Sequence, residues 1–104
     1  MAKNMNNLLR QAQQMQQKMA TLQKELETRE LDVSAGGGMV KIKITGKQEL
    51  LSIKIDKECV DPNDVSTLEE LVLTAVNQAV KESQTMVSSA MSKVTGGLSI
   101  PGMF

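Results

Sequence analysis

The first segment of the chain has the hydrophobic periodicity of an amphipathic helix. Its apolar residues recur at alternating steps of three and four, without an intervening glycine or proline, at Met5, Leu8, Ala12, Met15, Met19, Leu22 and Leu26. This spacing places the side chains on one helix face and is typical of helices that pair along a heptad seam. The pattern predicts a helix over about residues 5–29, with glutamine, lysine and glutamate on its other faces.

The middle of the chain alternates between apolar and polar residues with a period of two. The alternation predicts strands at about residues 31–35, 39–45 and 50–56, separated by turns at Gly36-Gly37-Gly38 and Gly46-Lys47. We expect an antiparallel meander with one half-buried face. The three glycines could also form a phosphate-binding loop, but such loops lead from a strand into a helix, whereas this run leads into a strand. A hairpin connection is therefore favoured.

A second long helix is predicted over about residues 66–95. Its apolar face is broad from Val65 to Val80 and then narrows toward Val94. Ser66 and Glu69 have the spacing of a capping box, with Asp64 as a rival cap, and Gly96-Gly97 is the expected stop. The predicted fold class is α+β, with a long helix, a three-stranded antiparallel meander and a second long helix in one domain over residues 1–95. Residues 96–104 are expected to form a flexible tail.

The two predicted helices are too long for the sheet between them. At 1.5 Å per residue they measure roughly 37 and 45 Å, whereas a strand of five or so residues spans about 17 Å. The overhanging helices would expose apolar stripes, which monomers rarely do. The helices can pair within one chain, or a second chain can cover them, and we predict a two-fold homodimer. The alternative is a monomeric helical hairpin on a small sheet.

Charge is distributed unevenly, although the chain has twelve basic and twelve acidic residues. Residues 1–57 contain ten basic and six acidic residues, and residues 1–24 contain four cations and no acid. Lys3, Arg10 and Lys24 share the heptad position opposite the apolar seam, with Gln17 in the same row and Lys18 beside it. This basic row would suit phosphate, and the surrounding glutamines could pair with adenine. The same residues are also typical of a solvated, neutral helix face.

Catalysis is not expected from this composition. Histidine, tyrosine and tryptophan are absent, and Cys59 is the only cysteine, which excludes Cys–His and Ser–His arrangements and zinc-type clusters. The acids at the start of the second helix, such as Glu69 and Glu70, stabilise the helix dipole. We expect no enzyme activity, no metal or other cofactor and no small-molecule substrate. The lone thiol, and the lack of a membrane-length apolar run or a signal core, predict a cytoplasmic protein without membrane contact.

Five runs together resemble a known family. They are LLRQAQQMQQKMATLQKEL, GGGMVKIKITG, IDKECVDPND, LEELVLTAVNQAVKES and TGGLSIPGMF, and in this order they are similar to the YbaB/EbfC nucleoid-associated proteins over nearly the whole chain. The resemblance implies a tweezer-like homodimer with protruding helical arms. It also implies cofactor-free binding of double-stranded DNA in the nucleoid, with effects on nucleoid organisation or transcription.

The resemblance also implies which residues of this chain meet DNA. On the helical arms these would be Lys3, Arg10, Gln14, Lys18, Lys24, Lys81 and Lys93, with Ser89 beside the last. Leu68, Leu71, Val72 and Ala75 match the family's core motif, and Asn77 within it is expected to make a buried hydrogen bond, at the dimer contact. The net charge of this chain is zero, whereas a basic homologue would carry a positive net charge and attract DNA more strongly. The alternative function is a protein-interaction module whose helical arms grip a recombination or transcription partner.

Overall fold

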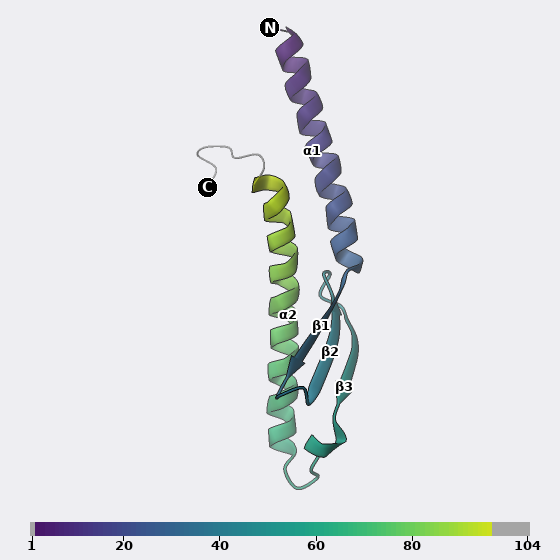
Figure 1. Cartoon of the computed structure of the whole chain (residues 1–104), viewed down its shortest axis with the longest axis vertical. Helices are drawn as coiled ribbons and strands as arrows, with labels where there is room; N and C mark the ends of the chain where they lie inside the picture. Colours follow the sequence, from purple (N-terminus) through teal and green to yellow (C-terminus); the bar gives the residue numbers. More distant parts are fainter. Residues whose placement is uncertain (1, 97–104) are drawn as a thin grey trace.

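The computed structural model describes residues 2–96, and the side chains of residues 4–94. Its elements follow the predicted order (Figure 1): α1 (Ala2–Thr28), β1 (Glu30–Ala35), β2 (Val40–Thr45), β3 (Leu50–Ile55), the short 3-10 helix η1 (Lys57–Cys59) and α2 (Val65–Gly96). The molecule measures 75 × 25 × 16 Å and its radius of gyration is 20.4 Å. A compact domain of this length would have a radius of gyration of about 13 Å, so the predicted overhang of the helices is confirmed. The expected tail falls almost entirely on residues 97–104, which lie outside the described residues.

The three strands form one antiparallel sheet in the order β1-β2-β3. Val33 lies opposite Ile42 in the first pair of strands, and Ile42 lies opposite Ile53 in the second. The register between β2 and β3 shifts at Lys43 and Ile44, which is the mark of a bulge. Because directly opposed residues share a face, the valines and isoleucines of all three strands lie on the same side of the sheet.

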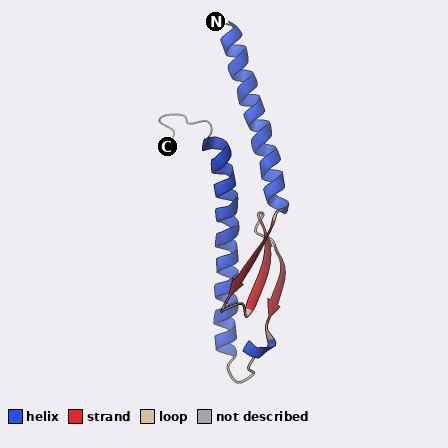
Figure 2. Ribbon diagram, in the orientation of Figure 1, coloured by secondary structure: helices blue, strands red, loops and turns tan. Residues whose placement is uncertain are grey.

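Helix α2 packs on this apolar face through small residues. Ala75 and Ala79 are fully buried, which lets the helix backbone approach the sheet closely. The rest of the buried cluster comes from β1 and β2, as Val33, Ala35, Val40, Ile42 and Ile44. Leu71, from the predicted core motif, packs against this cluster, and Leu68 and Val72 are half-buried. The core therefore lies between one helix and two strands (Figure 2).

Strand β3 differs from the prediction, because its apolar side chains are exposed. All six of its residues are exposed, and Ile53 keeps 44% of its surface in solvent although it lies opposite the buried Ile42. The reason is geometric: α2 lies over β1 and β2 and does not extend over the third strand. The alternating pattern correctly predicts the strand, but it does not show that the apolar face of this strand is exposed.

The end of α1 is fixed where it meets the sheet and α2. Leu26 is 1% exposed, and the backbone of Gly46 approaches its carbonyl so closely that an added Cβ would overlap it. The Gly46 amide donates to the Arg29 carbonyl at 3.1 Å. On the other side, the buried Ser83 hydroxyl donates to the Thr45 carbonyl at 2.7 Å, which ties α2 to the end of β2. These contacts determine the direction in which α1 leaves the sheet.

The start of α2 corrects one further prediction. The helix begins at Val65, and Asp64 rather than Ser66 is its cap. The Asp64 carboxylate accepts from the Thr67 hydroxyl at 2.7 Å and from the Thr67 amide at 3.4 Å. The Ser66 hydroxyl donates to the same carboxylate at 3.4 Å instead of capping the helix itself. The rival cap is therefore the one that the structure uses, and the Ser66–Glu69 capping box is wrong.

Asn77 is also not buried in the single chain. Its position on α2 is exposed, next to the half-buried Val76. The helix turns Ala75 and Ala79 toward the sheet, and a residue two positions from each lies on the opposite side. Within the described residues Asn77 is therefore not part of a buried hydrogen bond, and its place at a dimer contact stays a prediction.

Replacing Gly46 with alanine should destabilise the junction between α1 and the sheet. The new methyl group would meet the Leu26 backbone carbonyl, which cannot move without shifting α1. Overpacking of this kind costs about 1–3 kcal/mol, and urea denaturation of the variant measures it. Gly37→Asn is the matched control, because a Cβ there meets nothing within 4 Å and asparagine tolerates its positive φ. Equal stability of the Gly46→Ala variant and the wild type would contradict this packing.

Replacing Asp64 with alanine should lower the melting temperature in a pH-dependent way. The hydrogen bonds from Thr67 hold the pKa of the Asp64 carboxyl below its ordinary value. A lowered pKa means that the stabilisation is present above the carboxyl's unfolded pKa and is lost as the pH falls through the folded one. Melting curves should therefore separate wild type from Asp64→Ala at neutral pH and converge in acid. The Asp64→Asn variant is the control, because it keeps a capping side chain without a charge. A difference in melting temperature between Asp64→Ala and the wild type that persists in acid would contradict the role of the Asp64 carboxylate.

Candidate nucleic-acid interface

Helix α1 forms an arm that extends beyond the rest of the molecule. Its 27 residues give a length of about 40 Å, and its N-terminal half passes the end of α2 with no other element beside it (Figure 1). Met5 and Leu8, the first residues of the predicted seam, are 69% and 64% exposed. Met15, Met19 and Leu22 are half-buried, and Leu26 is buried. The seam therefore packs within the chain only over its C-terminal half.

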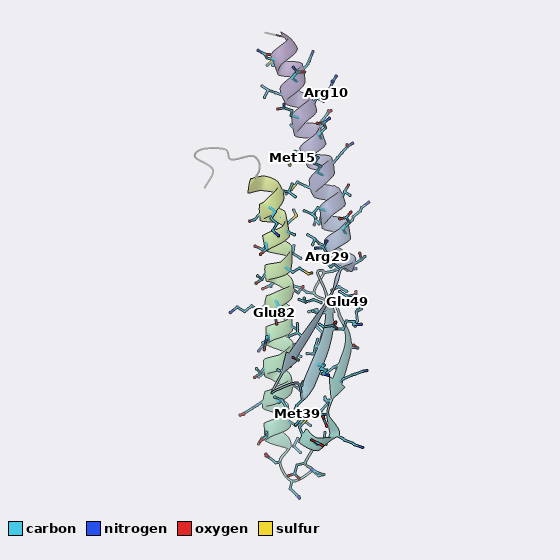
Figure 3. The ribbon with its side chains drawn as sticks, in the orientation of Figure 1. Arg10, Met15, Arg29, Met39, Glu49 and Glu82 are labelled. Atoms are coloured by element: carbon cyan, nitrogen blue, oxygen red, sulfur yellow. The ribbon has the colours of Figure 1, made fainter. Side chains whose placement is uncertain are left out.

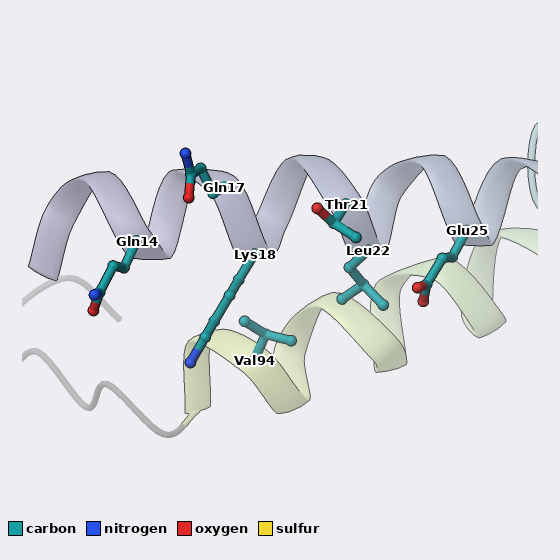
Figure 4. Close-up of a pocket in the computed structure, with 7 residues that line it drawn as sticks. All are labelled: Gln14, Gln17, Lys18, Thr21, Leu22, Glu25 and Val94. Atoms are coloured by element: carbon teal, nitrogen blue, oxygen red, sulfur yellow. The ribbon is translucent and has the colours of Figure 1, made fainter.

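A groove lies between this arm and the end of α2. It has a volume of about 670 Å³ and is lined by Gln14, Gln17, Lys18, Thr21, Leu22, Glu25 and Val94. Figure 4 shows the Lys18 side chain reaching across from α1 toward the last turns of α2, close to Val94. Leu22 and Val94 give the groove an apolar floor, and amide and ammonium groups and the Glu25 carboxylate line the rest of it. The groove thus combines hydrogen-bonding groups with a cation in the angle between the two helices.

The structure brings some of the predicted DNA-contacting residues together and leaves others apart. Gln14 and Lys18 line the groove, and Lys93 directly precedes Val94. Arg10 lies on α1 beyond the end of α2, whereas Arg29 lies where the helix meets the sheet (Figure 3).

Lys24 and Lys81 are exposed and do not line the groove. The side chain of Lys3 lies outside the described residues. The predicted residues thus divide between the groove and the outer surfaces of the two arms.

Sequence reasoning missed three residues of the groove, and a closer use of helical spacing could have found two of them. Thr21 and Glu25 follow Lys18 by three and seven residues, and positions three, four and seven apart share a helix face. Lys18, which lies beside the row opposite the seam, therefore belongs to the groove side of α1. Val94, the third missed residue, comes from the other helix, and no local pattern links it to Lys18.

The electrostatic character of the arm is positive over most of its length. Between residues 4 and 24, α1 carries Arg10, Lys18 and Lys24 and no carboxylate, and Glu25 is the first acid along it. All three cations are exposed. Within residues 2–96 no cluster of histidine, cysteine and carboxylate side chains could hold a metal ion. The arm therefore offers cations and amides to a ligand, the groups that bind phosphate oxygens and base edges.

The comparison with protein families decides the assignment. The YbaB/EbfC DNA-binding family matches residues 1–98. The chain belongs to this family. The resemblance inferred from the five sequence runs is thereby confirmed, and the family is described by DNA binding rather than by a catalysed reaction.

Similar proteins carry nucleoid-associated names. A nucleoid-associated protein of Desulforamulus reducens is 53% identical over 104 residues, covering 100% of this chain and 99% of that one. Another, from Thermoanaerobacter pseudethanolicus, is 52% identical over 101 residues, covering 97% of this chain and 91% of that one.

One solved structure has the same fold as this member of the YbaB/EbfC family. The crystal structure of an uncharacterised protein from Helicobacter pylori matches with a TM-score of 0.60 at 19% identity, and covers 85% of this chain and 98% of that one. The predicted order of helix, three-stranded antiparallel sheet and helix is therefore confirmed. None of the helices in the described part of the chain is long and apolar enough to cross a membrane.

Proposed function

We propose that this protein binds double-stranded DNA as a homodimer through its helical arms. In this proposal residues 1–95 act as one domain in the bacterial cytoplasm, associate with the nucleoid and affect nucleoid organisation or gene expression. The observation that carries the proposal is the match of residues 1–98 to the YbaB/EbfC DNA-binding family. The names of the relatives, which describe nucleoid-associated proteins, support the location.

The charges on the arm support binding through phosphate. Arg10, Lys18 and Lys24 are exposed on a helix whose first carboxylate is Glu25, so phosphate can approach Arg10 without a carboxylate nearby in sequence, whereas Lys18 and Lys24 lie closer to Glu25. Each phosphate neutralised by such a cation releases counterions from DNA, which favours binding at low salt. Lys81 and Lys93 on α2, and Lys3 at the start of α1, would add to this surface, and Gln14 could contact a base edge.

The exposed face of β3 supports the homodimer. Ile53 and Ile55 lie opposite the buried Ile42 and Val40, yet they keep 44% and 39% of their surface exposed in the described part of the chain. Leu50 and Leu51 extend this apolar surface along the same edge strand. An uncovered apolar edge strand promotes association with another chain. A second copy of the chain would cover it and would present two pairs of arms, which raises affinity through multivalency.

The free end of α1 favours a second candidate function. Met5, Leu8 and Leu9 are each more than 60% exposed at the part of the arm beyond α2. Apolar side chains gathered at the end of a helix are suited to a helix-binding groove on another protein. The arms could therefore grip a protein partner in recombination or transcription, a function that does not require duplex DNA.

Removing two cations from the arm should weaken binding to DNA of any sequence. For the Lys18→Ala, Lys24→Ala double variant we expect lower affinity for duplex DNA. The slope of log affinity against log salt should be less steep by about 0.9 for each lost phosphate contact. Mobility shifts or fluorescence anisotropy over a series of salt concentrations measure both quantities.

Lys57→Ala serves as the matched control for charge removal. Lys57 is an exposed lysine of η1, at the end of the molecule away from the arm (Figure 1). Its replacement should change neither affinity nor slope appreciably. If the wild type binds no duplex even at low salt, the DNA proposal is wrong and the protein-partner candidate takes its place.

Placing a charge on the apolar face of β3 should dissociate the dimer. Ile53→Asp would bury a carboxylate in the proposed interface, whereas the single chain tolerates it because Ile53 is 44% exposed. We expect the dimer dissociation constant to rise by about tenfold or more, measured by sedimentation equilibrium. Ser52→Asp on the opposite face of the same strand is the control and should remain dimeric. An Ile53→Asp variant that stays as dimeric as the wild type would contradict this interface.

A further inference from the structure

A second positive surface lies on the sheet, on the side turned away from α2. Lys41 and Lys43 alternate along β2 with the buried Val40, Ile42 and Ile44, so their side chains project from the opposite face. Lys54 of β3 is paired directly with Lys41. We call Lys41, Lys43 and Lys54 the sheet lysine cluster.

This arrangement is electrostatically unfavourable in the absence of a ligand. Directly opposed residues on one face of an antiparallel pair have Cβ atoms about 5 Å apart, and like charges at such positions repel. Asp32 lies opposite Lys43 and Asp56 lies near Lys41 and Lys54, yet within the described part of the chain none of the three lysines forms an ion pair. The Asp56 carboxylate instead accepts from the Glu58 amide at 2.9 Å.

The charge around the cluster stands out in a chain whose net charge is zero. Residues 39–56 contain four lysines and two carboxylates, Glu49 and Asp56, which gives a local charge of +2. The only other strongly positive segment is residues 1–24. Two shallow hollows of about 240 Å³ each adjoin the cluster, one reaching Asp32 and Ser52 and the other reaching Gly38 and Met39. Anionic oxygens can therefore approach the ammonium groups from the solvent side.

We infer that the sheet lysine cluster is a second phosphate-contacting surface for duplex DNA, separate from the helical arms. The inference rests on the proposed function, and charge complementarity identifies the ligand as a polyanion with closely spaced phosphates. A dimer formed through the apolar face of β3 leaves the cluster accessible, because the lysines occupy the other face of the sheet. A duplex held by the arms and another held by the sheet would allow one dimer to bridge two DNA segments.

The test compares a Lys41→Gln, Lys43→Gln, Lys54→Gln variant with the wild type and with the arm variant described above. We expect the triple variant to bind duplex DNA more weakly and to show a salt slope reduced by about 0.9 per lost contact, additive with the effect of the arm variant. Its melting temperature should equal or exceed that of the wild type, because a like-charge pair has been removed. Reaction of Lys41 and Lys54 with an amine-reactive label should also fall when duplex DNA is present.

The outcomes separate this inference from the proposed function. If the wild type binds duplex DNA without protecting Lys41 and Lys54 from the label, and the triple variant matches it in affinity and salt slope, the cluster is not a DNA surface, although the arms can still be. If the wild type binds no duplex, both proposals fail. If the cluster lysines are protected by vesicles containing phosphatidylglycerol and not by duplex DNA, the polyanion is a lipid surface and the inference is wrong. Lys57→Gln, which removes a lysine of η1 outside the cluster, is the control and should bind as the wild type does.

Discussion

One helix covers only two of the three strands, and the rest of the architecture follows from this constraint. Ala75 and Ala79 bring α2 close to β1 and β2, and the buried residues of those strands complete the core. Within residues 2–96 no helix covers the apolar side of β3, whose isoleucines alternate with polar residues in the same way as those of β2. Because α2 has 32 residues and the strands have six each, the helix also extends well beyond the sheet. Its far half is then available to pair with the base of α1.

The contacts at the end of α1 determine how the two long helices are oriented relative to the sheet. Gly46 lies against the Leu26 carbonyl, and the Ser83 hydroxyl donates to the Thr45 carbonyl, so both long helices are attached to the same end of the sheet. From this point the helices diverge and enclose the groove that Lys18 crosses. A small core can therefore position two long polar arms. The stability of the core and the direction of the arms depend on the same few contacts.

The fold was predictable from the sequence to a large extent, because its periods of 3.5 and 2 are clean. The seam from Met15 to Leu26 and the alternation in β2 both correspond to buried or half-buried residues. The exposure of β3 was not predictable, since alternation indicates which face is apolar but not whether another element covers it. The capping of α2 was ambiguous because Asp64 and Ser66 are both good cap residues, and the Thr67 hydroxyl favours Asp64. The family motif did not indicate that Asn77 lies on the side of α2 away from the sheet, so the predicted hydrogen bond at a dimer contact stays a prediction.

The candidate site was predictable only in part. The basic residues of α1 could be found from charge, and they are exposed on an arm. The groove could not be found, because it depends on the angle between α1 and α2 and joins Lys18 to Val94 across 76 positions of sequence. The cross-strand pair of Lys41 and Lys54 likewise depends on the register of β2 and β3. Pairings between distant segments are a property of the folded chain, and they determine which cations act together.

Sedimentation velocity of the protein with a fluorescently labelled duplex at low salt tests the central claim most directly. A single experiment reports both the mass of the free protein and its association with DNA. The account predicts that the free protein sediments as a dimer, and that the duplex co-sediments with a whole number of dimers and is released as salt is added. A free protein that sediments as a monomer, or a duplex whose sedimentation does not change when the protein is added, would contradict it.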